Sequence, residues 1–429
     1  MINRKIVSFL FLGVAALIIS YHFILRPFLY PFNEDVKGYV LKNIEPITTI
    51  NPDGLEFQDL NVLRKSIGDS RVVLLGEQDH GDAATFLAKT RIIKFLHQSL
   101  DFDVLVFESD FYGLNYSNNN LIENVVKGSH SFVDNIYPLW GQCDSFKPMI
   151  DYIIDNRGTS NPLTVSGIDP RHVLKCSREH YLDDLSSFIN ESEVSIAPDK
   201  LSQFYKTVET VLTDEYSSNV TGDQLAAFYE VLLEVKSSAI GNVFWEQEMR
   251  NLEGFVRNSL DSSISNNIRD VQMGDNLLWL LNKKYKDKKV VVWASNTHIF
   301  KDFSIIKEQN LILSNPDTIN TGSYVYEKLK DEMYVLGVTS YSGNGGRLGE
   351  KGFEIIEPQS NFFESWVYET DFPYAFIDFS NMPENLKKEM FFMKTLVHKP
   401  RIANWFNMFD GIIYIQNMFP CKSEQVTRN

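Results

Sequence analysis

The chain has 429 residues, 44% of them hydrophobic, which is enough to bury the core of one large α/β domain with insertions or of two domains. Its formal net charge is −15, and basic residues gather only in short stretches such as 283–289. Because phosphate contacts from Lys and Arg supply most of the affinity for nucleic acid, this charge balance argues against a nucleic-acid partner.

The first 30 residues have the pattern of a membrane anchor. Ile6 to Leu25 forms a stretch of 20 residues without a formal charge, preceded by Arg4 and Lys5, and that length spans a bilayer as a helix. No small-residue cleavage pattern follows it. We therefore expect an uncleaved anchor at 1–30 with the C-terminal domain outside the cytoplasm. The alternative is a cleaved signal peptide, which would make the protein secreted or periplasmic.

After the anchor, prolines and mixed polarity indicate a juxtamembrane linker with a short helix at 31–55, followed by one folded domain at 56–420. Apolar residues at helical spacing predict helices over 57–70 and over 82–100, the second with Asp82 as its cap.

Four short apolar runs predict parallel strands covered on both faces, since such strands lack an alternation of polar and apolar residues. The runs are Val72–Leu75, Val104–Phe107, Leu163–Ser166 and Val290–Trp293. Each run passes directly into polar or ionisable residues, namely 76–81 (GEQDHG), 108–110 (ESD), 167–170 (GIDP) and 294–298 (ASNTH).

The second half of the chain adds helices and further strands. Repeated helical patterns at about 177–262 predict a helical insertion over the carboxyl ends of the strands. In the next helix, at about 263–286, Arg269, Met273 and Asn276 share one face. Further strands are predicted at 334–341, 375–379 and 412–415, and the glycine-rich stretch at 342–347 is predicted to be a turn.

These elements predict an α/β fold with a mainly parallel sheet flanked by helices. In such sheets ligands bind beyond the carboxyl ends of the strands. The residues expected to converge there are Glu77, His80, Glu108, Asp169 and His298. Two histidines among three carboxylates indicate an active site with acid–base chemistry.

The three cysteines, Cys143, Cys176 and Cys421, include no C-x-x-C pair, so neither a zinc cluster nor a disulfide framework is indicated. We expect three isolated buried thiols, with a single bridge as the alternative. The chain also lacks a G-x-S-x-G nucleophile elbow, which argues against a serine α/β-hydrolase. It contains no H-E-x-x-H pair, P-loop or G-x-G-x-x-G loop either.

Five motifs in order resemble those of the erythromycin esterase-like hydrolases. They are Gly76-Glu77…His80-Gly81, Glu108, Gly167…Asp169, Arg269-Asp270…Met273…Asn276 and Trp293-Ala294-Ser295-Asn296-Thr297-His298. The resemblance covers about residues 55–420. Two features depart from the family pattern: Ser295 stands where the family often has a histidine, and extra residues after His80 leave either Lys89 or Arg91 at the family's basic position.

The resemblance implies hydrolysis of a small-molecule carboxylic ester or lactone without a cofactor. His80 would be the general base, Glu77 or Glu108 would orient it, and Arg269 or His298 would stabilise the oxyanion. The residues that would bind substrate are Asp169, Asn276, Asn296 and Arg91. Two alternatives stay open: a divalent-metal hydrolase that uses His80 and His298 with the carboxylates, and an inactive, membrane-tethered binding protein of the same fold.

Overall fold

The computed structural model describes residues 33–54, 56–115, 132–192, 194–214, 219–261, 265–303, 306–308, 311–312 and 318–423. Within these ranges, no helix is both long and apolar enough to cross a bilayer. The predicted anchor over Ile6–Leu25 lies outside the described residues.

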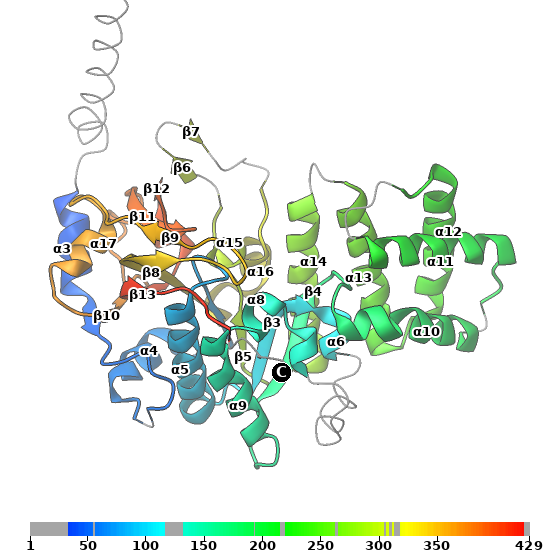
Figure 1. The fold of residues 1–429 in the computed structure, drawn as a ribbon, viewed down its shortest axis with the longest axis horizontal. Coiled ribbons are helices and arrows are strands. Elements are labelled where there is room, and N and C mark those ends of the chain that lie inside the picture. Colours follow the sequence, from blue (N-terminus) through cyan, green and yellow to red (C-terminus); the bar gives the residue numbers. More distant parts are fainter. Residues whose placement is uncertain are drawn as a thin grey trace, which may run out of the picture.

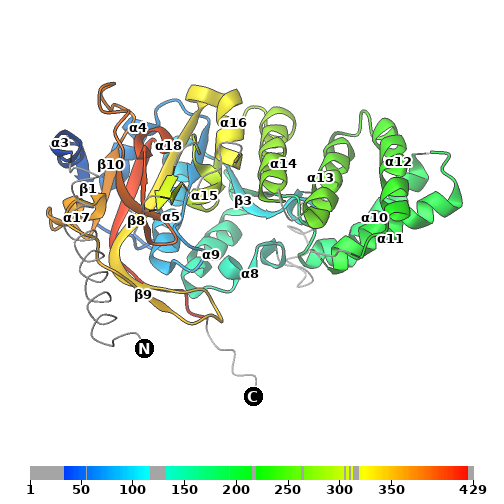
Figure 2. The ribbon, with the colours of Figure 1, turned by 90° about the horizontal axis from the view of Figure 1, so that it is seen from above.

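The centre of the described structure is a sheet of nine strands, most of them parallel (Figures 1 and 2). Its order is β1-β10-β13-β8-β2-β5-β3-β4, with β9 paired to β8. The strands are β1 (Ile44–Pro46), β2 (Val72–Leu75), β3 (Val104–Asp110), β4 (Thr164–Asp169), β5 (Val290–Trp293), β8 (Met333–Gly345), β9 (Phe353–Ile355), β10 (Tyr374–Asp378) and β13 (Gly411–Met418). The pairs from β13 to β4 are all parallel. The predicted fold class is therefore confirmed, and the four strands that carry the site motifs are neighbours.

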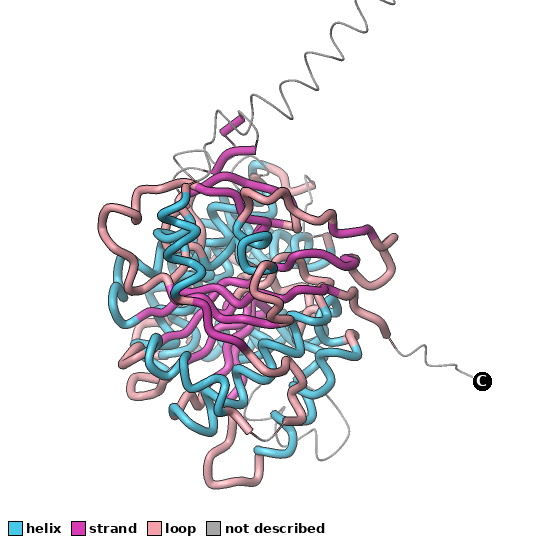
Figure 3. The backbone as a smooth tube through the Cα atoms, turned by 90° about the vertical axis from the view of Figure 1, so that its left-hand side faces the viewer, coloured by secondary structure: helices cyan, strands magenta, loops and turns pink. Residues whose placement is uncertain are grey.

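The central strands are apolar throughout because each face of the sheet has its own core. Val73 and Leu75 point into one core, and Val72 and Leu74 point into the other. The first core is closed by α4 (Asn61–Ile67), α5 (Ala83–Leu100) and α9 (Lys147–Asn156). The second is closed by α3 (Glu34–Lys42), α14 (Ser265–Trp279), α16 (Thr321–Leu329), α17 (Phe363–Tyr368) and α18 (Trp405–Met408). Figure 3 shows the strands running between these two layers of helices.

Short helical turns connect these elements. They are η2 (Gln58–Leu60), α6 (Phe111–Asn115), η3 (Phe132–Asn135), α8 (Pro138–Gly141), η4 (Asp144–Phe146), η5 (Leu280–Lys284), α15 (Asn296–Ile299) and η6 (Lys330–Glu332).

The predicted helical insertion is present after β4 and has a core of its own. It consists of α10 (Lys175–Glu191), α11 (Pro198–Thr213), α12 (Gly222–Ser238) and α13 (Val243–Leu260). Figure 1 shows α10 to α12 projecting beyond the β4 edge of the sheet, with α13 beside α14. Asn251 of α13 donates to the carbonyl of Pro170, so the insertion meets the sheet at the carboxyl end of β4.

Two parts of the fold were not predicted. Residues 31–55 were expected to be a linker with a short helix; that helix is α3, which packs on the second core, whereas β1 was not predicted and pairs antiparallel with β10, so this segment completes the sheet. A second, antiparallel sheet has the order β11-β12-β6-β7. Its strands are β11 (Phe391–Leu396), β12 (Lys399–Ala403), β6 (Ile306–Glu308) and β7 (Leu311–Ile312).

The expectation of three free thiols is also wrong. Cys143 and Cys421 form a disulfide between Cα atoms 5.4 Å apart, and the buried Cys176 is not part of it. The bridge joins residues 278 positions apart in the sequence. Closing a loop of this length removes much of the conformational freedom of the unfolded chain.

We expect replacement of both Cys143 and Cys421 by Ser to lower the free energy of unfolding by about 2–5 kcal/mol, because the unfolded chain regains that freedom. Dithiothreitol should lower the melting temperature of the wild type and leave that of the double variant unchanged. The control is Cys176→Ser, which keeps the bridge and should respond to dithiothreitol as the wild type does. Equal melting temperatures for wild type with and without dithiothreitol would contradict the expected role of the bridge.

Candidate active site

The first site segment is the loop between β2 and α5, residues 76–82. Two glycines let it approach neighbouring loops: a Cβ on Gly76 would lie 1.9 Å from Oδ1 of Asn296, and one on Gly81 would lie 2.2 Å from the carbonyl oxygen of Gly346. Larger residues would push these segments apart. The glycines of the GEQDHG motif therefore bring the loop that carries Glu77 and His80 against the ends of β5 and β8.

Glu77 is completely buried and is surrounded by hydrogen-bond donors. His80 Nδ1 donates to its Oε1 at 2.7 Å, Trp140 Nε1 donates to the same oxygen at 2.8 Å, and Lys89 Nζ donates to Oε2 at 2.9 Å. Burial lowers the pKa of Lys89 to about 8, although the carboxylate of Glu77 opposes that shift. Three donors compensate the buried carboxylate and hold it in one orientation.

His80 has one ring nitrogen fixed and the other available. Its Nδ1 is held by Glu77, whereas its Nε2 makes no hydrogen bond to any residue that the structure describes. The side chain is 20% exposed, and its ring meets Trp140 edge to face with centroids 5.3 Å apart. A histidine held in this way keeps Nε2 as a proton acceptor that water can reach.

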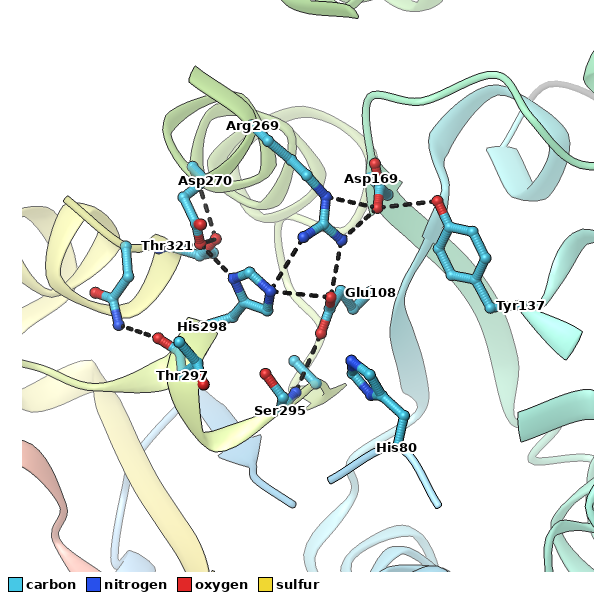
Figure 4. A network of polar contacts seen from close by, with 12 residues as sticks. His80, Glu108, Tyr137, Asp169, Arg269, Asp270, Ser295, Thr297, His298 and Thr321 are labelled. Atoms are coloured by element: carbon cyan, nitrogen blue, oxygen red, sulfur yellow. Dashed lines mark hydrogen bonds and ion pairs between the residues drawn. The ribbon is translucent and has the colours of Figure 1, made fainter. Parts of the chain in front are cut away.

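A second cluster is centred on the guanidinium group of Arg269 (Figure 4). Arg269 Nη2 donates to Glu108 Oε1 at 2.8 Å and to Asp169 Oδ2 at 2.5 Å, and Nε donates to Asp169 at 3.0 Å. These residues come from α14, β3 and β4. The pKa of Asp169 lies well below its usual range because Arg171 and Arg269 outweigh the effect of burial.

His298 lies between two carboxylates of this cluster. Its Nδ1 donates to Asp270 Oδ1 at 2.7 Å, and its Nε2 is 3.1 Å from Glu108 Oε1. Burial alone would lower the pKa of His298, but Asp270 and Glu108 outweigh it and raise the pKa to about 10. The pKa of Glu108 is in turn well below its ordinary value, because His298 and Arg269 overcome its burial.

The charges of this cluster balance when His298 is protonated. Three carboxylates then face three cations: Glu108, Asp169 and Asp270 against Arg171, Arg269 and His298. Figure 4 shows His80 beside Glu108 and Ser295, close to the cluster that contains His298. The structure therefore brings together Glu77, His80, Glu108, Asp169, Arg269 and His298.

Three residues expected to bind substrate lie in the scaffold instead. Asn276 is buried, donates to the carbonyl of Ile168 and to Asn251, and accepts from Gln247 and Gln272. Asn296 is also buried and binds backbone groups of Val338 and Thr395. Arg91 is paired with Asp59 and with carbonyls of residues 49 and 56. Their polar groups hold strands and loops together in the structure.

Sequence reasoning missed several members of the site. The basic partner of Glu77 is Lys89, not Arg91, although both lie on the helix predicted after His80. Tyr137 donates to Asp169, and Trp140 contacts Glu77 from a segment with no motif. Asp270 was visible beside Arg269, but nothing in the sequence linked it to His298.

Ser295 contributes its backbone to the site. It is buried, and its N–H donates to Glu108 Oε2 at 3.1 Å.

Among the described residues, no three His, Cys, Asp or Glu side chains are arranged as metal ligands. The space between Glu108 and Asp169 is filled by the guanidinium of Arg269.

The raised pKa of His298 predicts a specific pH dependence of stability. The folded protein keeps this proton up to about pH 10, whereas the unfolded chain loses it near the ordinary value of 6.5. The stabilisation by protonated His298 is therefore complete below pH 6.5 and is lost as the pH rises towards 10. In urea titrations, the stability difference between wild type and His298→Gln should shrink steadily from pH 6 to pH 9. A difference that stays constant over this range would show that His298 is neutral in the folded protein.

Comparison with known proteins identifies the family of the chain. The erythromycin esterase family model matches residues 97–418. YbfO of Bacillus subtilis (strain 168), named as a hydrolase, is 26% identical over 89% of this chain and 91% of its own length. Erythromycin esterase type II of Escherichia coli is 25% identical over 90% of this chain and 97% of its own length.

Solved structures share the fold. A Bacillus cereus protein has a TM-score of 0.73 at 17% identity, covering 92% of this chain and all of the other. A mutant of the erythromycin esterase EreC, in its open conformation, has a TM-score of 0.58 at 14% identity, covering 88% of this chain and 98% of the other. With the family model matching most of the chain, the protein belongs to the erythromycin esterase family.

Proposed function

We propose that the protein hydrolyses a carboxylic ester or lactone of a small molecule, with His80 as the general base that activates water. The observation that carries this proposal is the state of the His80 ring: Nδ1 is fixed by a buried carboxylate, and Nε2 is available beside Glu108, which binds the guanidinium of Arg269. This arrangement suits proton abstraction from water next to a carbonyl group whose oxygen becomes negative.

The reaction can be followed atom by atom. His80 Nε2 takes a proton from water, the water oxygen adds to the substrate carbonyl carbon, and the carbonyl oxygen becomes an oxyanion. When this tetrahedral intermediate collapses, the bond to the leaving oxygen breaks, and His80 returns its proton to that oxygen. Glu77 accepts the Nδ1–H bond throughout and stabilises the imidazolium that forms.

Arg269 supports the proposal as the oxyanion donor. Its Nη1 lies 3.0 Å from Nε2 of His298, and protonated His298 cannot accept a hydrogen bond there. Nε and Nη2 of Arg269 already bind Asp169 and Glu108. An N–H of Nη1 therefore lacks an acceptor within the cluster, and a substrate oxygen can supply one.

Asn in place of His80 keeps some hydrogen bonding but cannot accept a proton near neutral pH. On an ester that the wild type hydrolyses, His80→Asn should lower kcat by at least ~10²-fold with little change in KM. The matched control is His180→Asn, since His180 is exposed on α10, outside the active site. A loss of less than about threefold in kcat for His80→Asn would mean that another group takes the proton.

The same assay separates the alternatives. Activity that disappears with a chelator and returns with Zn²⁺ or Mn²⁺ would make His80 and His298 metal ligands. The inactive binding protein would be favoured by a soluble preparation that binds a lactone or simple ester from a broad panel but hydrolyses none of them. This alternative is motivated by Ser295, which stands where the family often has a histidine.

We further propose that the domain works outside the cytoplasm. The Cys143–Cys421 bridge supports this location, because disulfides persist in oxidising compartments. The apolar stretch Ile6–Leu25 supports attachment by an N-terminal helix. In cell fractionation, the full-length protein should remain with membranes after a carbonate wash, and protease added outside should digest the domain. Recovery of soluble protein that starts near residue 27 would show a cleaved signal peptide instead.

A further inference from the structure

A cavity of about 330 Å³ lies next to the β11–β12 hairpin, and none of the active-site residues named above lines it. Most of its wall is apolar, formed by Phe353, Ile355, Ile356, Pro358, Phe362, Val397 and Pro400. Three of these residues are unusually accessible: Ile356 is 70% exposed, Phe353 42% and Val397 41%. Large accessible apolar side chains gathered around one cavity indicate a binding site for an apolar ligand group.

The buried polar side chains of the wall already have partners within the protein. Lys394 Nζ donates to the carbonyls of Tyr341 and Ile356. His398 Nε2 is 2.9 Å from Asp82 Oδ1, and its Nδ1 is 3.2 Å from the hydroxyl of Ser340. The two carboxylates of the wall, Glu354 and Glu357, are balanced by the two lysines, Lys394 and Lys399. The cavity therefore offers apolar contact without a net formal charge, which suits a neutral ligand group.

The turn of the hairpin is strained. Val397 and His398 are the two residues between the paired positions Leu396 and Lys399, and their φ angles are +42° and +57°. Such a turn normally contains Asn-Gly, and a β-branched residue with positive φ is costly. Strain of this kind persists only where surrounding contacts impose it.

The contacts that impose it come from the loop that carries His80. The Val397 N–H donates to the carbonyl of Gln78 at 3.1 Å, and Gln78 Nε2 donates to the carbonyl of Lys394. His398 pairs with Asp82 at the other end of the same loop. Ser340, His398 and Asp82 resemble a nucleophilic triad, but Ser340 is completely buried. The constellation therefore holds the loop rather than attacking a substrate.

We propose that this cavity binds a neutral apolar group, such as a short acyl chain or a small ring, and that its occupancy reaches the loop 76–82 through the Val397–His398 turn. The group can belong to a separate effector molecule or to the substrate itself. The effect on turnover rests on the proposed function, whereas binding and its effect on the loop do not.

Binding is tested with the neutral fluorescent probe N-phenyl-1-naphthylamine on the full chain. Ser at both Phe353 and Ile356 should weaken probe binding at least about tenfold, because two accessible apolar contacts are lost. Both side chains are exposed, so the fold should tolerate the change. The matched control is Ile240→Ser, since Ile240 is 76% exposed in the helical insertion, and its probe affinity should equal that of the wild type. Equal affinity in the double variant and the control would overturn the site.

Coupling is tested by hydrogen–deuterium exchange of the peptide that contains residues 76–82. Probe binding should slow exchange there in the wild type but not in His398→Gln, which loses the contact with Asp82 while keeping the apolar wall. Unchanged exchange in the wild type with bound probe would overturn the coupling. In ester hydrolysis, a change in kcat identifies a separate effector site, whereas a competitive rise in KM alone assigns the cavity to the substrate's own apolar group. Absence of hydrolysis would refute the proposed function and leave the binding and exchange results valid.

Discussion

The arrangement of the site depends on the hydrogen bonds and ion pairs that the guanidinium group of Arg269 makes. It joins the ends of β3 and β4 to α14 through Glu108 and Asp169, and it lies against His298 from the turn after β5. Buried carboxylates so close together would repel one another, and removal of one partner from such a cluster leaves an unpaired buried charge. With Arg269 in place, the same charges fix three strand ends and α14 in one geometry and hold Glu108 beside His80.

The strand ends could be predicted from sequence because their signal is local. Each apolar run is followed at once by its ionisable residue, and parallel strands bring such residues to one edge of a sheet. That reasoning placed Glu77, His80, Glu108, Asp169 and His298 together. For Asn276, Asn296 and Arg91 a motif shows that a polar residue matters, whereas its partners within the protein, backbone carbonyls or Asp59, are seen only in the structure.

The other failures have a common physical origin in contacts between distant segments. Trp140 reaches Glu77 from a segment without periodicity, and Cys143 finds Cys421 across most of the domain. The β11–β12 hairpin turns on Val397 and His398, residues that no turn preference would select, because contacts from the loop 76–82 compensate the strain. Local propensity carries no information about such compensation.

The tail at residues 419–422 has a consequence for how the redox state of the protein reaches the candidate site. The N–H of Cys421 donates to the carbonyl of Gly81, the carbonyl of Phe419 accepts from Ala83, and the carbonyl of Lys422 accepts from Asp144. The tail thus connects the His80 loop to the segment that carries Trp140. The Cys143–Cys421 disulfide makes its connection to the Trp140 segment covalent. The segments that carry His80 and Trp140 therefore share one oxidisable support, so reducing conditions act on both sides of the candidate site at once.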